Sequence, residues 1–346
     1  MRASIIIVNY NGGDGLRQCL ASLLPDLSAE AEVIVVDNAS TDGSADDAEH
    51  AFPAVRLVRN TANLGFGAGN NVGARYASGE YLVFLNPDTT VEPGWLAALI
   101  GALDADPRAG LATPKILLLR DPGRINTCGN EMHCSGLTLC RGLGLDRGEL
   151  GLAAEVSAVS GAAFAIRREL FESLGGFDEA FFLYMEDTDL SWRARLMGYR
   201  CLYVPASIVY HDYALRFGPQ KTLYQERNRY LMLLKVLRWR TLAALLPALF
   251  LAEALTWGFV LLRERHRLGN KLRAYAWIMQ HWSRVMEQRR QTQALRRVGD
   301  RDLIVTCTHR LSYEQTGEGN IQRLAHVVFD PLFLVSHRLA LTAARR

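Results

Sequence analysis

Several common sequence signals are missing from this chain of 346 residues. None of its six cysteines form a CxxC pair, and the six-residue spacing of Cys128, Cys134 and Cys140 beside His133 is not that of a zinc module. We therefore expect reduced thiols. The first apolar run, Ile5–Val8, is too short for a secretory signal. Together these absences argue against a disulfide-stabilised secreted protein and predict a cytoplasmic one.

A dinucleotide-binding fingerprint is also incomplete. Gly65 and Gly67 follow the third predicted strand rather than the first, and Asn70 stands where the third glycine is due. We therefore exclude a redox cofactor domain. Gly65, Gly67 and Gly69 instead predict a backbone that passes close to a ligand or to a neighbouring element. No nucleic-acid-binding module is recognisable, so no nucleic-acid partner is expected.

The formal net charge of +3 hides a strong asymmetry. Residues 1–215 contain 16 Lys and Arg against 27 Asp and Glu, whereas residues 216–346 contain 23 against 9. The first part therefore carries a net −11 and the second a net +14. An acidic part suits metal-ion chemistry, and a basic part suits an anionic surface.

Apolar runs alternate with helical patterns through the first hundred residues. This alternation predicts an α/β fold with a doubly wound sheet. A cap at Ser40 or Thr41 is expected to start the second helix. The expected strands are Ser4–Val8, Val33–Val36, Val55–Val58 and Tyr81–Leu85, and the expected helices are about 14–24, one after residue 41, one ending at Ala77, and Trp95–Leu103.

The strand Tyr81–Leu85 ends at Asn86 and Pro87, which leaves Asp88 at its carboxyl end. Ligands of open α/β sheets bind at that edge. A carboxylate there suits a hard divalent cation that holds a diphosphate. The simpler alternative is a strand that ends in an Asx or proline turn.

Further chemistry is expected after a less regular, glycine-rich stretch, Thr113–Val156, that resembles substrate-shaping loops. Glu186, Asp187 and Asp189 open a helix that ends near Gly198. They either complement the helix dipole or supply a general base with a tuned pKa. Strand-like segments are Ser160–Ile166, Cys201–Val204 and Ser207–Tyr210, the last ending at His211, which is either structural or a metal ligand.

The motifs of residues 3–211 resemble, in order, those of the inverting family 2 glycosyltransferases. The motifs are VNYNG, VVDNASTDGS, RNxxNxGFGAGNN, FLNPDT, GGFDExFFxYxEDxDLxxRxxxxGY and the final His211. The most similar group is the rhamnosyltransferase-like enzymes of bacterial cell-surface polysaccharide assembly. The resemblance implies a GT-A fold, with a mixed sheet flanked by helices, and a cytoplasmic nucleotide-sugar donor.

The resemblance also implies a role for each matching residue. Asn9, Tyr10 and Asp37 are similar to contacts to the base and ribose, and Asn63 and Gly65 to parts of the same pocket. Asn86 and Asp88 take the places of the DxD motif, so Asp88, with His211, would bind Mg²⁺ or Mn²⁺. Asp187 matches the catalytic base and Glu186 its acidic companion. Relatives often continue His-x-x-Gly-x-Ser, whereas this chain reads HDYALR from His211, so its acceptor loop differs.

The resemblance predicts transfer of a sugar from dTDP-rhamnose or a UDP-sugar to a glycan or lipid-linked glycan, with inversion. One alternative is a sugar-1-phosphate nucleotidyltransferase, which would need a basic first loop that Asn9–Gly13 does not provide. The other alternative is a non-catalytic glycan-binding protein of the same fold.

The C-terminal part, residues 236–346, is expected to be mainly helical and to follow a catalytic domain of residues 1–235. Thr241–Leu262 is apolar except for Glu253 and also contains Pro247. It can span a bilayer, lie in its interface or form a soluble core helix. A helical stripe from Leu268 to Met286 fits core packing or interfacial binding. The flanking cations favour attachment to the cytoplasmic face of the inner membrane; they are Arg238, Arg240, Arg263, Arg265, Arg267, Lys271 and Arg273. Homo-oligomers are also compatible with this part.

Overall fold

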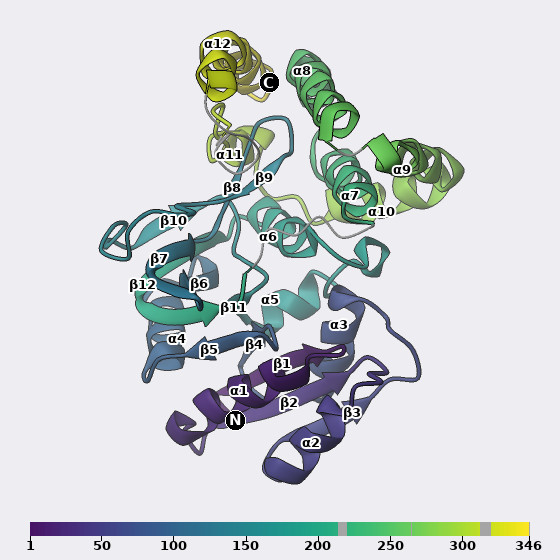
Figure 1. Cartoon of the computed structure of the whole chain (residues 1–346). Coiled ribbons are helices and arrows are strands. Elements are labelled where there is room, and N and C mark those ends of the chain that lie inside the picture. Colours follow the sequence, from purple (N-terminus) through teal and green to yellow (C-terminus); the bar gives the residue numbers. More distant parts are fainter. Residues whose placement is uncertain (214–219, 264, 312–319, 346) are drawn as a thin grey trace. The chain divides into compact units, whose positions relative to one another are not determined.

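A computed structural model describes residues 1–213, 220–263, 265–311 and 320–345 (Figure 1). The altered acceptor loop expected after Tyr213 falls on residues 214–219 and so lies outside the described residues. The chain divides into two compact units. The first comprises residues 1–130, 140–194 and 199–215, and the second comprises residues 131–139, 195–198 and 216–346.

A ten-stranded mixed sheet forms the first unit, with the path β10-β12-β6-β11-β4-β1-β2-β3. Outside this path, β5 pairs with β12 and β7 pairs with β6, while β8 and β9 form a separate two-stranded sheet. The strands are β1 Ala3–Asn9, β2 Ala31–Asp37, β3 Arg56–Arg59, β4 Tyr81–Leu85, β5 Thr89–Val91, β6 Ala109–Leu118, β7 Asp121–Thr127, β8 Asn130–Met132, β9 Thr138–Cys140, β10 Ala154–Val156, β11 Ala163–Arg167 and β12 Arg200–His211.

Helices cover the sheet because β1 and β4 are apolar on both faces and buried along their whole length. Helix α3 packs on β1 and β2, and α4 packs on β6 and β12. At Gly69 of α3, an added Cβ would lie 2.9 Å from a methyl of Val8, so glycine lets this helix approach the sheet closely. The helices of this unit are α1 Gly13–Leu23, α2 Ser44–Ala51, α3 Phe66–Tyr76, α4 Trp95–Ala105, α5 Arg168–Ser173 and α6 Glu186–Leu196, with 3-10 turns η1 Leu24–Asp26 and η2 Glu179–Phe181.

The expected α/β architecture is confirmed, but three local predictions are wrong. Part of the stretch predicted to be irregular, Thr113–Leu118, belongs to β6, which lies between β12 and β11 inside the sheet. Two expected strands are one, β12, which contains a register shift between Val204 and Ile208. Helix α2 is capped by Gly43 at φ 81° rather than by Ser40 or Thr41.

The second unit is helical. Its helices are α7 Lys221–Val236, α8 Trp239–Arg263, α9 Leu268–Gln280, α10 Trp282–Ala294, α11 Asp300–Ile304 and α12 Asn320–Ala343, with a 3-10 turn η3 at Arg265–Arg267. Among the described residues, Trp239–Leu262 is the one segment long and apolar enough to cross a membrane by length and composition.

Two expectations for this unit need correction. The predicted stripe from Leu268 to Met286 is divided between α9 and α10, and core packing does not account for Leu272 and Met279, which are 58 % and 77 % exposed. Lys271, expected among the surface cations, is fully buried. Its ammonium lies 3.1 Å from Glu226 Oε1 and 3.0 Å from Glu253 Oε2.

Candidate active site

The first group of predicted site residues lies where the parallel strands β1 and β2 end. Asn9 pairs in register with Asp37 at this edge. The Asn9 amide donates to Asp37 Oδ1, Ser40 Oγ and Ser44 Oγ, each at 3.0 Å, and its oxygen accepts from Gly12 N. The Asn9 side chain is therefore used within the protein and fixes Asp37, whereas the neighbouring Tyr10 is 51 % exposed and available to a ligand.

The next loop joins this group through an asparagine that the sequence analysis did not single out. Buried Asn38 donates to Gly65 O at 3.0 Å and lies 3.4 Å from Asn63 Oδ1. Asn63 Oδ1 also accepts from Gly65 N at 2.9 Å. Gly65 has φ 83° and ψ 178°, a conformation essentially restricted to glycine, and an added Cβ would lie 2.3 Å from Phe182 O. Gly65 therefore allows the loop to contact the segment that precedes α6.

Asp88 follows β4 and His211 ends β12, and the two side chains lie together. His211 Nε2 is 3.3 Å from Asp88 Oδ1. The other ring nitrogen, Nδ1, is 2.9 Å from Oδ1 of the buried Asn126. With Nδ1–H donating to Asn126, Nε2 keeps its lone pair and faces the carboxylate, as in a metal-ligating histidine.

This pair fits a divalent cation. Asp88 Oδ1 is buried without a hydrogen-bond partner, and two electron-rich atoms this close attract a positive ion between them. Carboxylate and imidazole suit Mn²⁺, and a carboxylate with phosphate oxygens suits Mg²⁺. Within the part of the chain that the structure describes, no three His, Cys, Asp or Glu side chains group together as a metal site. Oxygens of a bound diphosphate and water would therefore complete the coordination.

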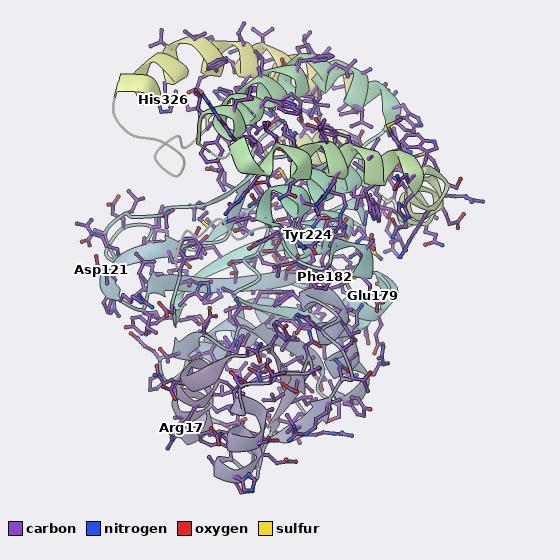
Figure 2. All side chains as sticks on the ribbon, turned by 45° about the vertical axis from the view of Figure 1, so that its right-hand side comes forward. Arg17, Asp121, Glu179, Phe182, Tyr224 and His326 are labelled. Atoms are coloured by element: carbon purple, nitrogen blue, oxygen red, sulfur yellow. The ribbon has the colours of Figure 1, made fainter. Side chains whose placement is uncertain are left out.

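The segment before α6 has an unusual backbone. Phe182 adopts φ 60° and ψ −56°, and Leu183 N donates to Phe181 O at 2.7 Å, which defines a classic γ-turn. Tyr184 and Met185 follow with φ 68° and 67°. Such residues cost about 1–3 kcal/mol each and concentrate at functional sites. Figure 2 labels Phe182 and Glu179 on this segment.

Buried aromatic packing holds the same region in place. The Phe177 ring contacts the rings of Phe66, Phe84, Phe164 and Phe171 at centroid distances of 5.0–6.2 Å. Arg193 of α6 pairs with Asp189 at 2.7 Å and donates to Leu174 O and Gly176 O. Asp189 therefore has a structural role, and it differs in this from the two acids before it.

Glu186 and Asp187 are adjacent and buried, but their surroundings are opposite. Asp187 accepts four hydrogen bonds, from Gly161 N at 2.7 Å, Asn130 Nδ2 at 2.9 Å, Thr188 N at 2.6 Å and Thr188 Oγ1 at 3.2 Å. Glu186 Oε2 has no partner. Burial and the charge of Asp187 raise the pKa of Glu186 well above its usual range. Burial also raises the pKa of Asp187, but its four donors oppose that shift.

The negative charge of the pair therefore rests on Asp187, and Glu186 is protonated at neutral pH. Asn130 was not identified from the sequence, and nor was Gly161. Their isolated positions in glycine-rich stretches carry no motif that would reveal them.

Hydrogen bonds connect Asp187 of α6 to the Asn86 turn. Gly161 N donates to Asp187, and the next residue, Ala162, accepts from Asn86 N at 2.9 Å. Asp88 O in turn accepts from Asp212 N beside His211. The structure thus links Asp187, Asn86, Asp88 and His211 at one edge of the sheet. Asn9, Asp37, Asn63 and Gly65 form a second linked group at the ends of β1 and β2.

Comparisons with known proteins identify the family and the fold. The model of the family described as "Glycosyl transferase family 2" matches residues 4–175. The N-acetylglucosaminyl-diphospho-decaprenol L-rhamnosyltransferase of Mycobacterium tuberculosis is 34 % identical over an alignment of 240 positions, which covers 62 % of this chain and 77 % of that protein. The low-salt glycan biosynthesis hexosyltransferase Agl10 of Haloferax volcanii is 29 % identical over 56 % of this chain and 61 % of its own length.

Solved structures show the same fold. TarS residues 1–349 from S. aureus in complex with UDP-GlcNAc aligns with all of this chain and 90 % of that one, with a TM-score of 0.58 and 18 % identity. A mannosyltransferase from Pyrobaculum calidifontis in complex with GDP-Man and Mn²⁺ aligns with 99 % of this chain and 86 % of that one, with a TM-score of 0.51 and 20 % identity. The fold is that of the GT-A glycosyltransferases. The chain belongs to glycosyltransferase family 2.

Proposed function

We propose that this glycosyltransferase is a metal-dependent, inverting hexosyltransferase that moves a sugar from a nucleotide-sugar donor to a glycan hydroxyl. The observation that supports the proposal is the hydrogen-bonded link, through Gly161 and Ala162, between the carboxylate of Asp187 and the turn that carries the expected diphosphate ligands Asn86 and Asp88. The similarity to an L-rhamnosyltransferase makes dTDP-rhamnose the first donor to test, followed by UDP-sugars.

In this proposal the residues at the ends of β1 and β2 hold the nucleoside. Tyr10 and Asp37 contact the base and ribose, and Asn9 positions Asp37. Asn63 and Gly65 shape the same pocket. Asn86, Asp88 and His211 bind the diphosphate side, and a Mg²⁺ or Mn²⁺ ion on Asp88 and His211 would supply positive charge for the leaving group.

Asp187 acts as the general base. Its carboxylate takes the proton of the acceptor hydroxyl while that oxygen forms a bond to the anomeric carbon and the bond to the diphosphate breaks. The attack comes from the face opposite the leaving group, so the configuration inverts. In the absence of substrate, the carboxylate of Asp187 accepts all four hydrogen bonds. The longest of them comes from the Thr188 hydroxyl, and rotation of the Thr188 side chain would break it and free an oxygen for the acceptor.

Glu186 contributes as a neutral acid beside the base. Because it carries no negative charge at neutral pH, it does not raise the pKa of Asp187 further by repulsion once the acceptor is bound.

The proposal includes a glycan or lipid-linked glycan acceptor, a role in cell-envelope polysaccharide biosynthesis, and action at the cytoplasmic face of the inner membrane. The similar rhamnosyltransferase is named for an acceptor on a decaprenol diphosphate. An acceptor of that kind sits at a bilayer surface, and the basic part of this chain, residues 216–346, matches an anionic surface. Residues 236–346 would then face the membrane and the acceptor.

A thermal-shift screen with dTDP-, UDP- and GDP-sugars, with and without Mg²⁺ or Mn²⁺, tests the donor. The true donor binds only the folded protein and raises its melting temperature in proportion to the logarithm of its concentration. Release of the nucleoside diphosphate with a glycan acceptor then tests transfer. Binding of a donor without any turnover over a range of acceptors would instead support a non-catalytic glycan-binding protein.

A further inference from the structure

Helix α8 leaves one apolar face uncovered within the second unit. Leu246, Phe250 and Leu261 are 48 %, 72 % and 46 % exposed. Spacings of four and eleven residues bring these three side chains to one face of a helix. The opposite face is packed, since Leu245, Ala248 and Ala252 are fully buried. The fold therefore buries only one of the two apolar faces of α8.

Helix α12 packs against α8 and repeats the pattern. Val328, Leu332, Val335 and Leu339, at spacings of four, three and four, are 45–57 % exposed. Phe333 and Ala340, on the other face, are fully buried. We call these two faces the apolar stripes of α8 and α12. Uncovered apolar surface of this extent on neighbouring helices marks a binding surface.

A buried ionic cluster prevents α8 from leaving its neighbours. Glu253, near the middle of α8, pairs with Arg229 of α7 and with Lys271 of α9, whose ammonium is 3.0 Å away. Tyr230 and Tyr275 also donate to this carboxylate. Arg229 and Lys271 are almost fully buried, so removing Glu253 from them would leave uncompensated buried charge.

This cluster decides between crossing and lying on a membrane. Helices α7 and α9 carry charged residues along their length, including Lys221, Arg227, Lys235 and Arg273, and do not suit a hydrocarbon interior. Since Glu253 ties α8 to both of them, α8 cannot cross a bilayer by itself. Only its apolar stripe is free to enter lipid.

The positive charge around the apolar stripes favours an anionic bilayer over a second copy of the chain as their partner. Exposed Arg240, Arg265, Arg273 and Arg338 lie on or beside α8, α9 and α12. Residues 216–346 carry a net +14, so a second copy of this chain would bring like charges together, whereas an anionic lipid surface would attract them. Apolar burial and cations together are the two signals of stable interfacial attachment.

We propose that α8 and α12 lie in the plane of an anionic bilayer, with their apolar stripes at the boundary between headgroups and acyl chains, and that the segment Trp239–Leu262 does not cross it. The inference deepens the proposed function, which places the acceptor at a membrane. It assigns the attachment to named side chains and resolves the orientation that the sequence leaves open.

Flotation with phosphatidylcholine vesicles, with and without phosphatidylglycerol, tests this orientation. Wild type should bind the anionic vesicles and be released by carbonate, as an in-plane helix is and a spanning helix is not. Phe250→Glu and Val335→Glu place a charge on each stripe and should weaken vesicle binding roughly tenfold or more. Leu152→Glu, at an apolar position that is 85 % exposed in the first unit, is the matched control and should bind as wild type does.

Other outcomes would overturn the inference. Carbonate-resistant binding would show that α8 spans the bilayer. Unchanged vesicle binding in both stripe variants would show that the apolar stripes do not contact the membrane. A dimer that Phe250→Glu dissociates, without vesicle binding by wild type, would assign the stripes to a second copy. Turnover of a water-soluble acceptor should stay at wild-type level in Phe250→Glu. If no acceptor is turned over but the vesicle results hold, the proposed function fails and this inference stands.

Discussion

Glu186 and Asp187 are chemically similar neighbours that the fold treats differently. Asp187 receives four donors, whereas one oxygen of Glu186 receives none. In a buried site, hydrogen bonds to the charged form decide which carboxyl ionises. The sequence motif shows only that two acids are adjacent. Their division into a charged carboxylate and a neutral acid follows from two donors on Thr188 and from Asn130 and Gly161, which come from distant parts of the chain.

Asp187→Asn tests the base directly. The substitution keeps the size of the side chain and removes its basicity, so turnover should fall by roughly 10²–10⁴-fold while donor affinity stays near that of wild type. Steady-state kinetics with a donor titration by calorimetry separates the two effects. Equal loss of donor binding and turnover would show that Asp187 belongs to the donor pocket rather than to the chemistry.

Glu186→Gln tests the neutral acid through the pH dependence of stability. The folded state keeps a proton on Glu186, whose pKa is raised, and the unfolded chain releases it above the ordinary value of about 4.5. The unfolded state then binds fewer protons, so wild-type stability falls as pH rises from that value toward the raised pKa, by up to about 1.4 kcal/mol per pH unit. Glutamine removes this proton exchange.

Melting curves of both proteins across that pH range supply the comparison. The melting temperature of wild type should decline more steeply with pH than that of Glu186→Gln. Parallel declines would mean that Glu186 is already ionised in the folded protein.

Asp88→Ala tests the metal pair. Without the carboxylate that faces His211 Nε2, Mn²⁺-dependent donor binding should be lost while the melting temperature of the unliganded protein changes little, because the Asp88 side chain is 47 % exposed. Isothermal titration of the donor with and without Mn²⁺ gives the result. Asp121→Ala, at an exposed position on β7, is the control and should behave as wild type. Full activity of wild type in excess chelator would defeat the metal assignment.

At the scale of elements, the contact between the Gly65 loop and the turn at Phe182 joins the proposed nucleoside pocket to the helix that carries Asp187. Phe66 N donates to Phe182 O at 2.8 Å, and Gly65 leaves no space for a side chain there. A substitution that shifts the backbone of one loop should therefore also shift the other.

Gly65→Ala should destabilise the protein more than Gly43→Ala. Gly43 has φ 81° and ψ −6°, the left-handed region in which an alanine costs about 1–2 kcal/mol. Gly65 has φ 83° and ψ 178°, a conformation that costs an alanine more because it is essentially restricted to glycine. At Gly43 nothing lies within 4 Å of an added Cβ, whereas at Gly65 the Cβ would meet Phe182 O at 2.3 Å. The difference in melting temperature between the two variants therefore measures the clash together with the additional backbone strain at Gly65. Equal losses would show that the two loops separate without cost.

The local elements of the first hundred residues could be predicted because each strand is a short apolar run bounded by turn formers. The errors occurred where pairing is distant in sequence. Strand β6 lies parallel to β12, about ninety residues away, and its Thr113, Pro114 and Lys115 do not resemble a buried strand. The motifs predicted Asp88, Asp187 and His211 as site residues. The hydrogen-bond partners Asn126 and Asn130 depend on the folded arrangement and leave no local pattern.

At the scale of the whole molecule, the chain combines a GT-A unit with a helical unit of opposite charge. The charge difference was visible in the sequence, but which of the cations are exposed and which are buried was not. Lys271 counted as a surface cation, yet it is buried in the cluster around Glu253. Lys271 was predicted to contact lipid, and the structure instead places it in the buried ionic cluster that ties α8 to α7 and α9.

The central claim is a single displacement with Asp187 as base, and the anomeric configuration of the product tests it most directly. Wild-type protein would be incubated with the donor found in the screen, Mn²⁺ and a glycan acceptor, and the new glycosidic bond examined by NMR coupling constants. The account predicts a configuration opposite to that of the donor. A product that retains the donor configuration would contradict it.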